Sequence, residues 1–319
     1  MFSEKIEKAF EQMEKAIQLL KESLDISFLD AYIENGDNVL DDFQVRVLEE
    51  KPDRETTLKL EKIYQELQQI HLEPEELRRL SQLLLLKGNK SEPLQANHQL
   101  TPDSIGFLFV YLLEQLYPKK EPLRLLDISS GMGNLLLTVL LNLQVASYQN
   151  TGYGVDVDDT LLSVASVNSG LTGADLQMFH QDGLQDLLVD PVDAALSDLP
   201  VGYYPNDEKA SAFAVAASQG HTYAHHLLME QAMKYVKPAG FGLFLVPSNL
   251  FESEQNTHLK RWLQAQVYLQ GIIQLPDGLF QSEQSRKSIL ILQNKGQEAF
   301  QAKEVLLAKL ASLKDSQNI

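Results

Sequence analysis

Acidic side chains stand at the ends of consecutive apolar runs, where an open α/β sheet places its chemistry. The first run, residues 123–128, contains Asp127 and leads into a turn over residues 129–133. Gly131 and Gly133 let this backbone pass close under a ligand, and the N–H groups of a helix that starts after the turn favour an anionic or carboxylate group. Strand, glycine turn and helix start together predict a site for the charged end of a small molecule.

The next two expected strands each end close to an acid. Asp156 lies in the strand expected over residues 152–157, 23 residues after Gly133, a spacing that suits ribose hydroxyls. Asp182 follows the strand expected over residues 176–180, where a carboxylate can meet the edge of an adenine ring. Helix capping is the alternative for each acid taken alone. Together the three acids predict a nucleoside-binding row, and their neighbours Val157, Gly183 and Leu184 are candidates for the same site.

A fourth acid, Asp198, closes the apolar run 192–196 and faces a loop rich in proline and tyrosine. An acceptor followed by Pro200 and then by Tyr203 and Tyr204 has the parts to hold a planar amine and to stack on its ring. Ordinary loop packing is the alternative for the two tyrosines.

The turn after the first strand also discriminates between cofactors. Dinucleotide enzymes usually place a third glycine three residues after Gly133, and Leu136 stands there. Asp127, four residues before Gly131, instead suits a cofactor with a cationic amino group. The residues therefore favour S-adenosylmethionine over NAD, and an NAD-dependent oxidoreductase stays as the weaker alternative.

Composition bounds the class of protein. The 319 residues are 44% apolar, which is enough for a substantial core, and they include no cysteine, which excludes disulfides, thiolate zinc sites and cysteine nucleophiles. No apolar run approaches the roughly 20 residues of a membrane helix, and the N-terminus has no secretory apolar region. We expect a cytoplasmic protein without a membrane partner.

Charge is distributed unevenly along the chain. The net charge is −17, and between Leu125 and Glu208 there are twelve Asp or Glu and no Lys or Arg. If this stretch lines a cleft, it repels polyanions, because nonspecific nucleic-acid binding depends on Lys and Arg that neutralise phosphates. A solvated acidic surface that aids solubility is the alternative.

Apolar spacing divides the chain into two parts. Residues 1–95 have the apolar period of helices, with loops expected at Asn35-Gly36, Lys51-Pro52 and Glu73-Pro74, and the first of these could equally be a hairpin turn. The polar segment 87–93 is taken as the boundary. Residues 96–319 alternate short apolar runs with amphipathic segments, which predicts an α/β fold. We therefore expect a Rossmann-like sheet with helices on both faces, preceded by a smaller helical domain; residues 305–310 fit a helix or a last edge strand.

With these motifs in order, residues 97–295 resemble the class I S-adenosylmethionine-dependent methyltransferases. The chain looks most like the adenine-specific DNA methylases of type I restriction-modification systems. The motifs that carry the resemblance occur in that family's order: 100–102, the glycine turn, Asp156, Asp182, the Asp198 loop, 236–242 and 272–280.

The resemblance implies a methyltransferase that uses S-adenosylmethionine. Thr101 and the turn residues would hold the methionine part, Asp156 the ribose hydroxyls and Asp182 the adenine amine. The candidate cofactor-binding residues at the turn are Asp127, Ser129, Ser130, Gly131, Gly133 and Asn134. Asp198 and the Leu199 carbonyl would accept hydrogen bonds from a target amine, with Pro200 and Tyr203 beside them, so that positioning and electrostatics supply the rate.

The chain departs from the family at the acceptor loop. The family has Asn or Asp, two prolines and then Tyr or Phe, whereas Val201 stands here at the place of the ring that would grip a flipped base. The sequence also contains no identifiable target-recognition domain. N6-adenine DNA methylation is therefore one expectation beside methylation of RNA or protein. A catalytically impaired partner subunit, or a homodimer, is the alternative from another class.

Histidines do not suggest a metal site. His221 and His225 are four apart on an expected helix, but no carboxylate stands within the motif where a metalloprotease needs its base. We expect His225 and His226 to be a buried and an exposed member of one helix, and we expect no metal.

Overall fold

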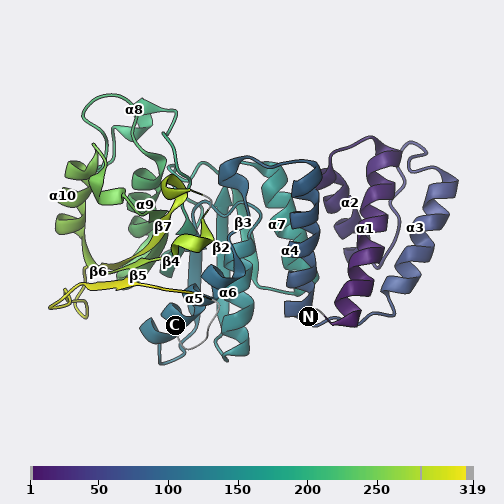
Figure 1. The fold of residues 1–319 in the computed structure, drawn as a ribbon, viewed down its shortest axis with the longest axis horizontal. Helices are drawn as coiled ribbons and strands as arrows, with labels where there is room; N and C mark the ends of the chain where they lie inside the picture. Colours follow the sequence, from purple (N-terminus) through teal and green to yellow (C-terminus); the bar gives the residue numbers. More distant parts are fainter. Residues whose placement is uncertain (1–2, 281, 314–319) are drawn as a thin grey trace.

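Four long helices form the N-terminal part of the protein (Figure 1). The computed structural model describes residues 3–280 and 282–313. The helices are α1 (Glu4–Leu24), α2 (Phe28–Leu40), α3 (Arg54–Leu67) and α4 (Pro74–Ser91). The side chains of Ser3, Ser27 and Asp53 accept backbone N–H groups at the starts of the first three, and Glu73 and Glu76 form a capping box at the fourth. These caps satisfy donors that a helix start leaves unpaired.

The loop or hairpin turn expected at Asn35-Gly36 is wrong, because both residues lie inside α2 and are buried. Gly36 serves close packing of helices: a Cβ placed on it would stand 2.1 Å from Cγ1 of Val167 in α7 (Asp159–Thr172). The small residue therefore lets α2 approach α7 more closely than any other side chain would permit.

Gly36→Ala is expected to lower the free energy of unfolding by about 1–3 kcal/mol, the typical cost of overpacking. The gain in helix propensity, at most about 1 kcal/mol, does not offset a contact of this kind. Urea unfolding of the purified protein measures the change. Gly278→Ala is the matched control, since a Cβ there meets no atom within 4 Å, and equal stabilities of the two variants would contradict the packing role.

The rest of the chain forms one sheet in the order β3-β2-β1-β4-β5-β7-β6-β8. Strand β7 runs antiparallel to both of its neighbours, and the other adjacent pairs are parallel. The strands are β1 (Leu123–Asp127), β2 (Asn150–Asp156), β3 (Leu176–His180), β4 (Val192–Asp198), β5 (Val236–Pro247), β6 (Val267–Gln274), β7 (Lys287–Asn294) and β8 (Leu306–Lys309). The segment that fitted a helix or a strand is thus an edge strand, fixed by its pairing with β6.

Helices cover both faces of this sheet. They are α5 (Asp103–Leu116), α6 (Asn134–Val145), α7, α9 (Ala224–Tyr235) and α10 (Asn256–Gln266). A short helix, α8 (Asp207–Ala210), lies in the loop between β4 and α9. Leu125 of β1 packs in the core that contains α5 and α6, whereas the next residue, Leu126, packs in the core that contains α9 and α10. Successive side chains of a strand point to opposite faces of the sheet, so each strand contributes to two apolar layers. The expected α/β fold with a preceding helical domain is confirmed.

The helical part and the sheet part share apolar packing. Helix α7 lies between the sheet and α2 and α4 (Figure 1). Its Leu161, Val164 and Val167 belong to the same buried cluster as apolar residues of α1 to α4. Met132 of the glycine turn is buried in that cluster too, which ties the turn to the helical part.

Helix α4 continues through Ser91, so most of the polar segment 87–93 is helical. The division at residue 95 stays a prediction. Among the described residues, no helix is both long and apolar enough to cross a bilayer.

Candidate active site

Parallel pairing brings three of the four acids to the same edge of the sheet. Asp127, Asp156 and Asp198 are the last residues of β1, β2 and β4, and β1 lies between the other two strands. Asp182 lies two residues beyond the end of β3. Because the carboxyl ends of parallel strands meet at one edge, residues up to 71 positions apart become neighbours there.

The glycine turn joins β1 to α6 in a conformation that needs glycine. Gly131 and Gly133 have φ of 50° and 73°, in the left-handed region. A Cβ on Gly133 would also stand 3.0 Å from the Cβ of Ala165 in α7, whereas the space next to Gly131 is open. Ser130 N–H donates to the carbonyl of Val155, which fixes the turn on β2. The open side of Gly131 is where a ligand can approach the backbone.

Asp156 holds the turn from the neighbouring strand. Its Oδ2 accepts the Gly131 N–H at 2.8 Å, and its Oδ1 accepts the Asp158 N–H at 3.1 Å. The next residue, Val157, is largely exposed. Asp156, which was expected to bind ribose hydroxyls, is therefore hydrogen-bonded to the glycine turn.

Asp127 is fully buried beneath the turn. The Ser197 hydroxyl and the Ser129 N–H both donate to its Oδ1. Burial raises the pKa of Asp127 to about 7, and the nearby charges of Asp156 and Asp198 act in the same direction, while the two hydrogen bonds oppose the shift. A carboxyl group with such a pKa changes its charge near neutral pH.

Asp198 is held by two side chains from distant segments. Thr101 Oγ1 donates to its Oδ2 at 2.9 Å, and Lys287 at the start of β7 forms an ion pair with its Oδ1. Asn134, the first residue of α6, accepts the N–H of Thr101 at 3.3 Å and donates to its carbonyl at 2.8 Å. Thr101, which was expected to hold the methionine part of the cofactor, is thus hydrogen-bonded to Asp198, which was expected to hold the target amine.

Asn97, which the sequence analysis did not single out, fixes the loop after Asp198. Its amide accepts the Val201 N–H and donates to the Val201 carbonyl, both at 3.2 Å. Leu199 is buried, and its N–H donates to the carbonyl of Leu245 in β5. The backbone around Pro200 is therefore held on both sides.

The two loop tyrosines have different surroundings. Tyr203, 54% exposed, stacks on Tyr223 with ring centroids 4.8 Å apart and an interplanar angle of 10°. Tyr223 stacks in turn on His225, with centroids 5.1 Å apart. Tyr204 instead donates its hydroxyl to Asp182 at 2.6 Å. Tyr203 thus keeps ring surface open to solvent, while Tyr204 is bound to the cofactor side of the candidate site.

Asp182 also pairs with Lys209 at 2.7 Å and accepts the Leu184 N–H at 3.0 Å. Burial alone would raise the pKa of Asp182, but the hydrogen bonds from Lys209 and Tyr204 outweigh it and lower the pKa. Gly183 leaves room for Leu228 of α9, since a Cβ there would stand 2.7 Å from that side chain.

One cavity of about 590 Å³ lies at this edge of the sheet, within the usual range for small-molecule pockets. Its lining contains these predicted site residues: Thr101, Asp127, Ser129, Ser130, Gly131, Asn134, Asp198, Leu199 and Pro200. The remaining predicted residues lie outside it: Gly133, Asp156, Val157, Asp182, Gly183, Leu184 and Tyr203. Among the lining residues, all of which belong to the described part of the chain, Lys287 carries the only permanent positive charge.

Lys287 and Asn97 had no local signal that could reveal them. Lys287 is 89 residues from Asp198, and Asn97 is 104 residues from Val201. Lys287 is the first residue of β7, and only the order of the strands in the sheet brings it close to Asp198.

The expected positions of the histidines need correction. His221 precedes α9, which begins at Ala224, and pairs with Asp207 at 2.9 Å instead of sharing a helix face with His225. His225 and His226 are both buried, because both face the packed interior beneath Tyr223. Within residues 3–280 and 282–313 no group of three or more metal-ligating side chains is found.

A parallel sheet with one antiparallel strand, a glycine turn after β1 and acids at the following strand ends define the class I S-adenosylmethionine-dependent methyltransferase fold. The sequence profile of the N-6 DNA methylase family matches residues 85–318, and that of the YtxK N-terminal helical domain matches residues 7–89. The chain therefore belongs to the N-6 DNA methylase family and is a methyltransferase.

Two relatives match nearly the whole chain. The uncharacterised protein YtxK of Bacillus subtilis (strain 168) is 37% identical over 95% of this chain and 91% of its own. A Listeria monocytogenes structure, described as a candidate class I S-adenosylmethionine-dependent methyltransferase, is 41% identical, with a TM-score of 0.90 over 99% of this chain and 95% of its own. The methyltransferase subunit of a type I restriction-modification system from Streptococcus thermophilus shares the fold, with 14% identity and a TM-score of 0.62 over 88% of this chain and 65% of its own.

Proposed function

We propose that this protein transfers a methyl group from S-adenosylmethionine to an amine nitrogen held by Asp198 and the Leu199 carbonyl. One observation carries the proposal: a single cavity joins buried Asp127, the open side of Gly131 and the Asp198 loop. A cofactor and a target amine bound there would lie next to each other, and such proximity lowers the barrier to transfer.

The residues around the turn fit this cofactor. The Asp127 carboxyl suits the cationic amino group, and the turn backbone from Ser129 with Thr101 suits the methionine carboxylate. Asp156 and Asp182 suit the ribose hydroxyls and the adenine amine, with Val157, Gly183 and Leu184 beside them. In this structure both carboxylates already accept hydrogen bonds from the chain, so the nucleoside would share or replace those donors.

When bound, the cofactor supplies a methyl group on a positively charged sulfur. The Asp198 carboxylate and the Leu199 carbonyl accept hydrogen bonds from the target amine, which directs its lone pair at that carbon. The target nitrogen would take this methyl group from the sulfonium, which would become a neutral thioether, and would give up one proton to Asp198 or to water. Asn97 and buried Leu199 keep this loop in place.

A planar acceptor fits the surroundings of this loop best. Val201 offers no ring, but Tyr203 stands two residues further on, and its stacking on Tyr223 leaves ring surface exposed. We propose adenine in DNA as the first acceptor to test, with RNA and protein amines as the alternatives. The acidic stretch around the site disfavours DNA and RNA alike, because both are polyanions.

The test has two stages. Isothermal titration calorimetry of the purified protein with S-adenosylmethionine should give saturable binding, and its absence would remove the proposal at its base. Transfer from radiolabelled S-adenosylmethionine to fractionated cell extract should then label one polymer, which DNase, RNase and protease digestion of parallel samples identify.

The second candidate is a cofactor-binding partner subunit that has lost catalysis, alone or as a homodimer. Lys287 occupies an oxygen of Asp198, and Lys209 occupies an oxygen of Asp182, so the carboxylates proposed for the target amine and for the adenine amine are both already paired with an ammonium group. This candidate predicts cofactor binding without labelling of any fraction, and labelling of any polymer would exclude it.

A further inference from the structure

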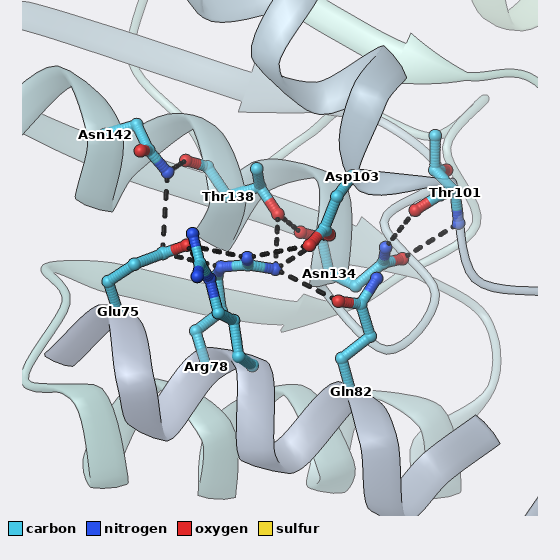
Figure 2. A network of polar contacts seen from close by, with 9 residues as sticks. Glu75, Arg78, Gln82, Thr101, Asp103, Asn134, Thr138 and Asn142 are labelled. Carbon is cyan, nitrogen blue, oxygen red and sulfur yellow. Dashed lines mark hydrogen bonds and ion pairs between the residues drawn. The ribbon is translucent and has the colours of Figure 1, made fainter. Parts of the chain in front are cut away.

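Arg78 of α4 is a buried guanidinium at the junction of the helical part with α5 and α6 (Figure 2). It donates to both oxygens of Asp103, at 2.9 and 3.0 Å, and to both oxygens of Glu75, at 2.7 and 2.8 Å. A further bond of 3.2 Å reaches the hydroxyl of Thr138 in α6. Burial alone would lower the pKa of Arg78, but the bonds to Glu75 and Asp103 outweigh it and raise the pKa, so the group stays charged.

Two of the partners of Arg78, Asp103 and Thr138, lie next to residues of the candidate active site. Asp103 is the first residue of α5, two positions after Thr101. Thr138 is one turn after Asn134 on α6, and its hydroxyl also donates to the Asn134 carbonyl at 2.7 Å. Arg78 therefore sets the position of the start of α5 relative to the start of α6.

From these helix starts the hydrogen bonds continue to the acceptor carboxylate. The side-chain amide of Asn134 forms hydrogen bonds with both the backbone N–H and the backbone carbonyl of Thr101, as Figure 2 shows. The Thr101 hydroxyl then donates to Asp198. An unbroken series of contacts thus runs from α4 of the helical part to the end of β4.

Close packing makes this series stiff. Gly106 of α5 faces Thr138, and a Cβ there would stand 2.7 Å from the Thr138 methyl group. The planar fork of an arginine fixes direction as well as charge, which a lysine cannot reproduce when two partners lie on different helices.

We propose that Arg78 is a positioning residue of the acceptor site, and that the helical part thereby holds Thr101 against Asp198. The activity readout of this proposal rests on the proposed function, whereas its structural readout does not.

The test compares Arg78→Lys with Arg79→Lys. Arg79 is the matched control, because it is 46% exposed and pairs with Glu75 of its own helix. In Arg78→Lys, amide hydrogen exchange measured by mass spectrometry should be faster over residues 97–104 and 196–203, with no change in Arg79→Lys. If methyl transfer is found, kcat should fall about tenfold or more in Arg78→Lys, as expected when a catalytic constellation is misplaced by a fraction of an ångström, while KM for S-adenosylmethionine changes less.

A double variant separates positioning from general destabilisation. In a Thr101→Val background the series is already interrupted, so adding Arg78→Lys should change kcat little. If Arg78→Lys does not fold, Thr138→Val, which removes one branch, should give the same exchange pattern. Equal exchange in the Arg78 and Arg79 variants would overturn the proposal even if the enzyme is inactive; unchanged kcat in an active Arg78 variant would overturn it while the proposed function stands.

Discussion

Asp198→Ala is expected to lower methyl transfer by about 10²–10³-fold, the usual loss when a preorganised polar group at a reacting centre is removed. The variant loses the carboxylate that accepts a hydrogen bond from the target amine, and it removes the ion-pair partner of Lys287. Cofactor binding should persist, because Asp127 and the glycine turn are untouched. Initial rates at saturating S-adenosylmethionine, together with calorimetric titration, measure both quantities.

Asp198→Asn sharpens this test. The asparagine keeps an oxygen for the amine but loses the charge that pairs with Lys287, so its rate should lie between those of the wild type and the alanine variant. Asp190→Ala is the control, since Asp190 is 84% exposed and its ion pair with Arg124 is a long one of 3.7 Å. An alanine variant as active as the wild type would exclude Asp198 from the reaction.

Asp127→Asn is expected to change cofactor affinity and stability in opposite directions. Loss of a charge-assisted hydrogen bond to the amino group should weaken S-adenosylmethionine binding at least about tenfold. Wild-type affinity should rise as the pH increases from 6 to 8, because the Asp127 carboxyl has a pKa of about 7, whereas affinity of the variant should depend less on pH. Calorimetric titration at pH 6 and 8 measures both trends.

The stability effect follows from proton linkage. The pKa of Asp127 is raised from 3.8 to about 7 in the folded protein, so between about pH 4 and 7 the folded state keeps a proton that the unfolded state has lost. The contribution of Asp127 to stability therefore falls as the pH rises through this window and is constant above it. Asparagine mimics the neutral acid and lacks this fall.

The variant should thus be more stable than the wild type at pH 8 by a few kcal/mol, since a tenfold change in an acid dissociation constant corresponds to about 1.4 kcal/mol, and similar to it near pH 4. Urea unfolding at pH 4, 6 and 8 gives the comparison, with Asp190→Asn as the exposed control. Parallel stability curves for wild type and Asp127→Asn would show that the carboxyl is not the buried titrating group.

Local patterns predicted the sheet well because each strand is a short apolar run bounded by turn residues, and a buried parallel sheet needs such runs. Every expected strand is present, with ends displaced by a few residues. The pattern failed where packing decides. The pair Asn35-Gly36 is a local signal for a turn, but the two residues lie inside a helix. The close packing of Gly36 against Val167, 131 residues away, overrides the local signal. Residues 305–310 form a strand because β6 offers an edge, which no local pattern reveals.

The candidate site divides in the same way. Asp127, Asp156 and Asp198 could be found because strand ends are visible in the sequence, and the sheet order then brings them together. The charges that pair with Asp198 and Asp182 could not be found in this way. Lys287 and Lys209 reach their carboxylates through sheet order and loop folding, and these contacts decide how much of each carboxylate is free for a ligand.

The apolar face that α7 shares with α1 to α4 has a consequence for how the protein unfolds. Leu161, Val164 and Val167 are buried by residues that lie before the sheet part of the chain. Losing the helices would expose this face to water, and losing α7 would leave the helices without much of their core. We therefore expect the helical part and the sheet part to unfold together, in one cooperative transition.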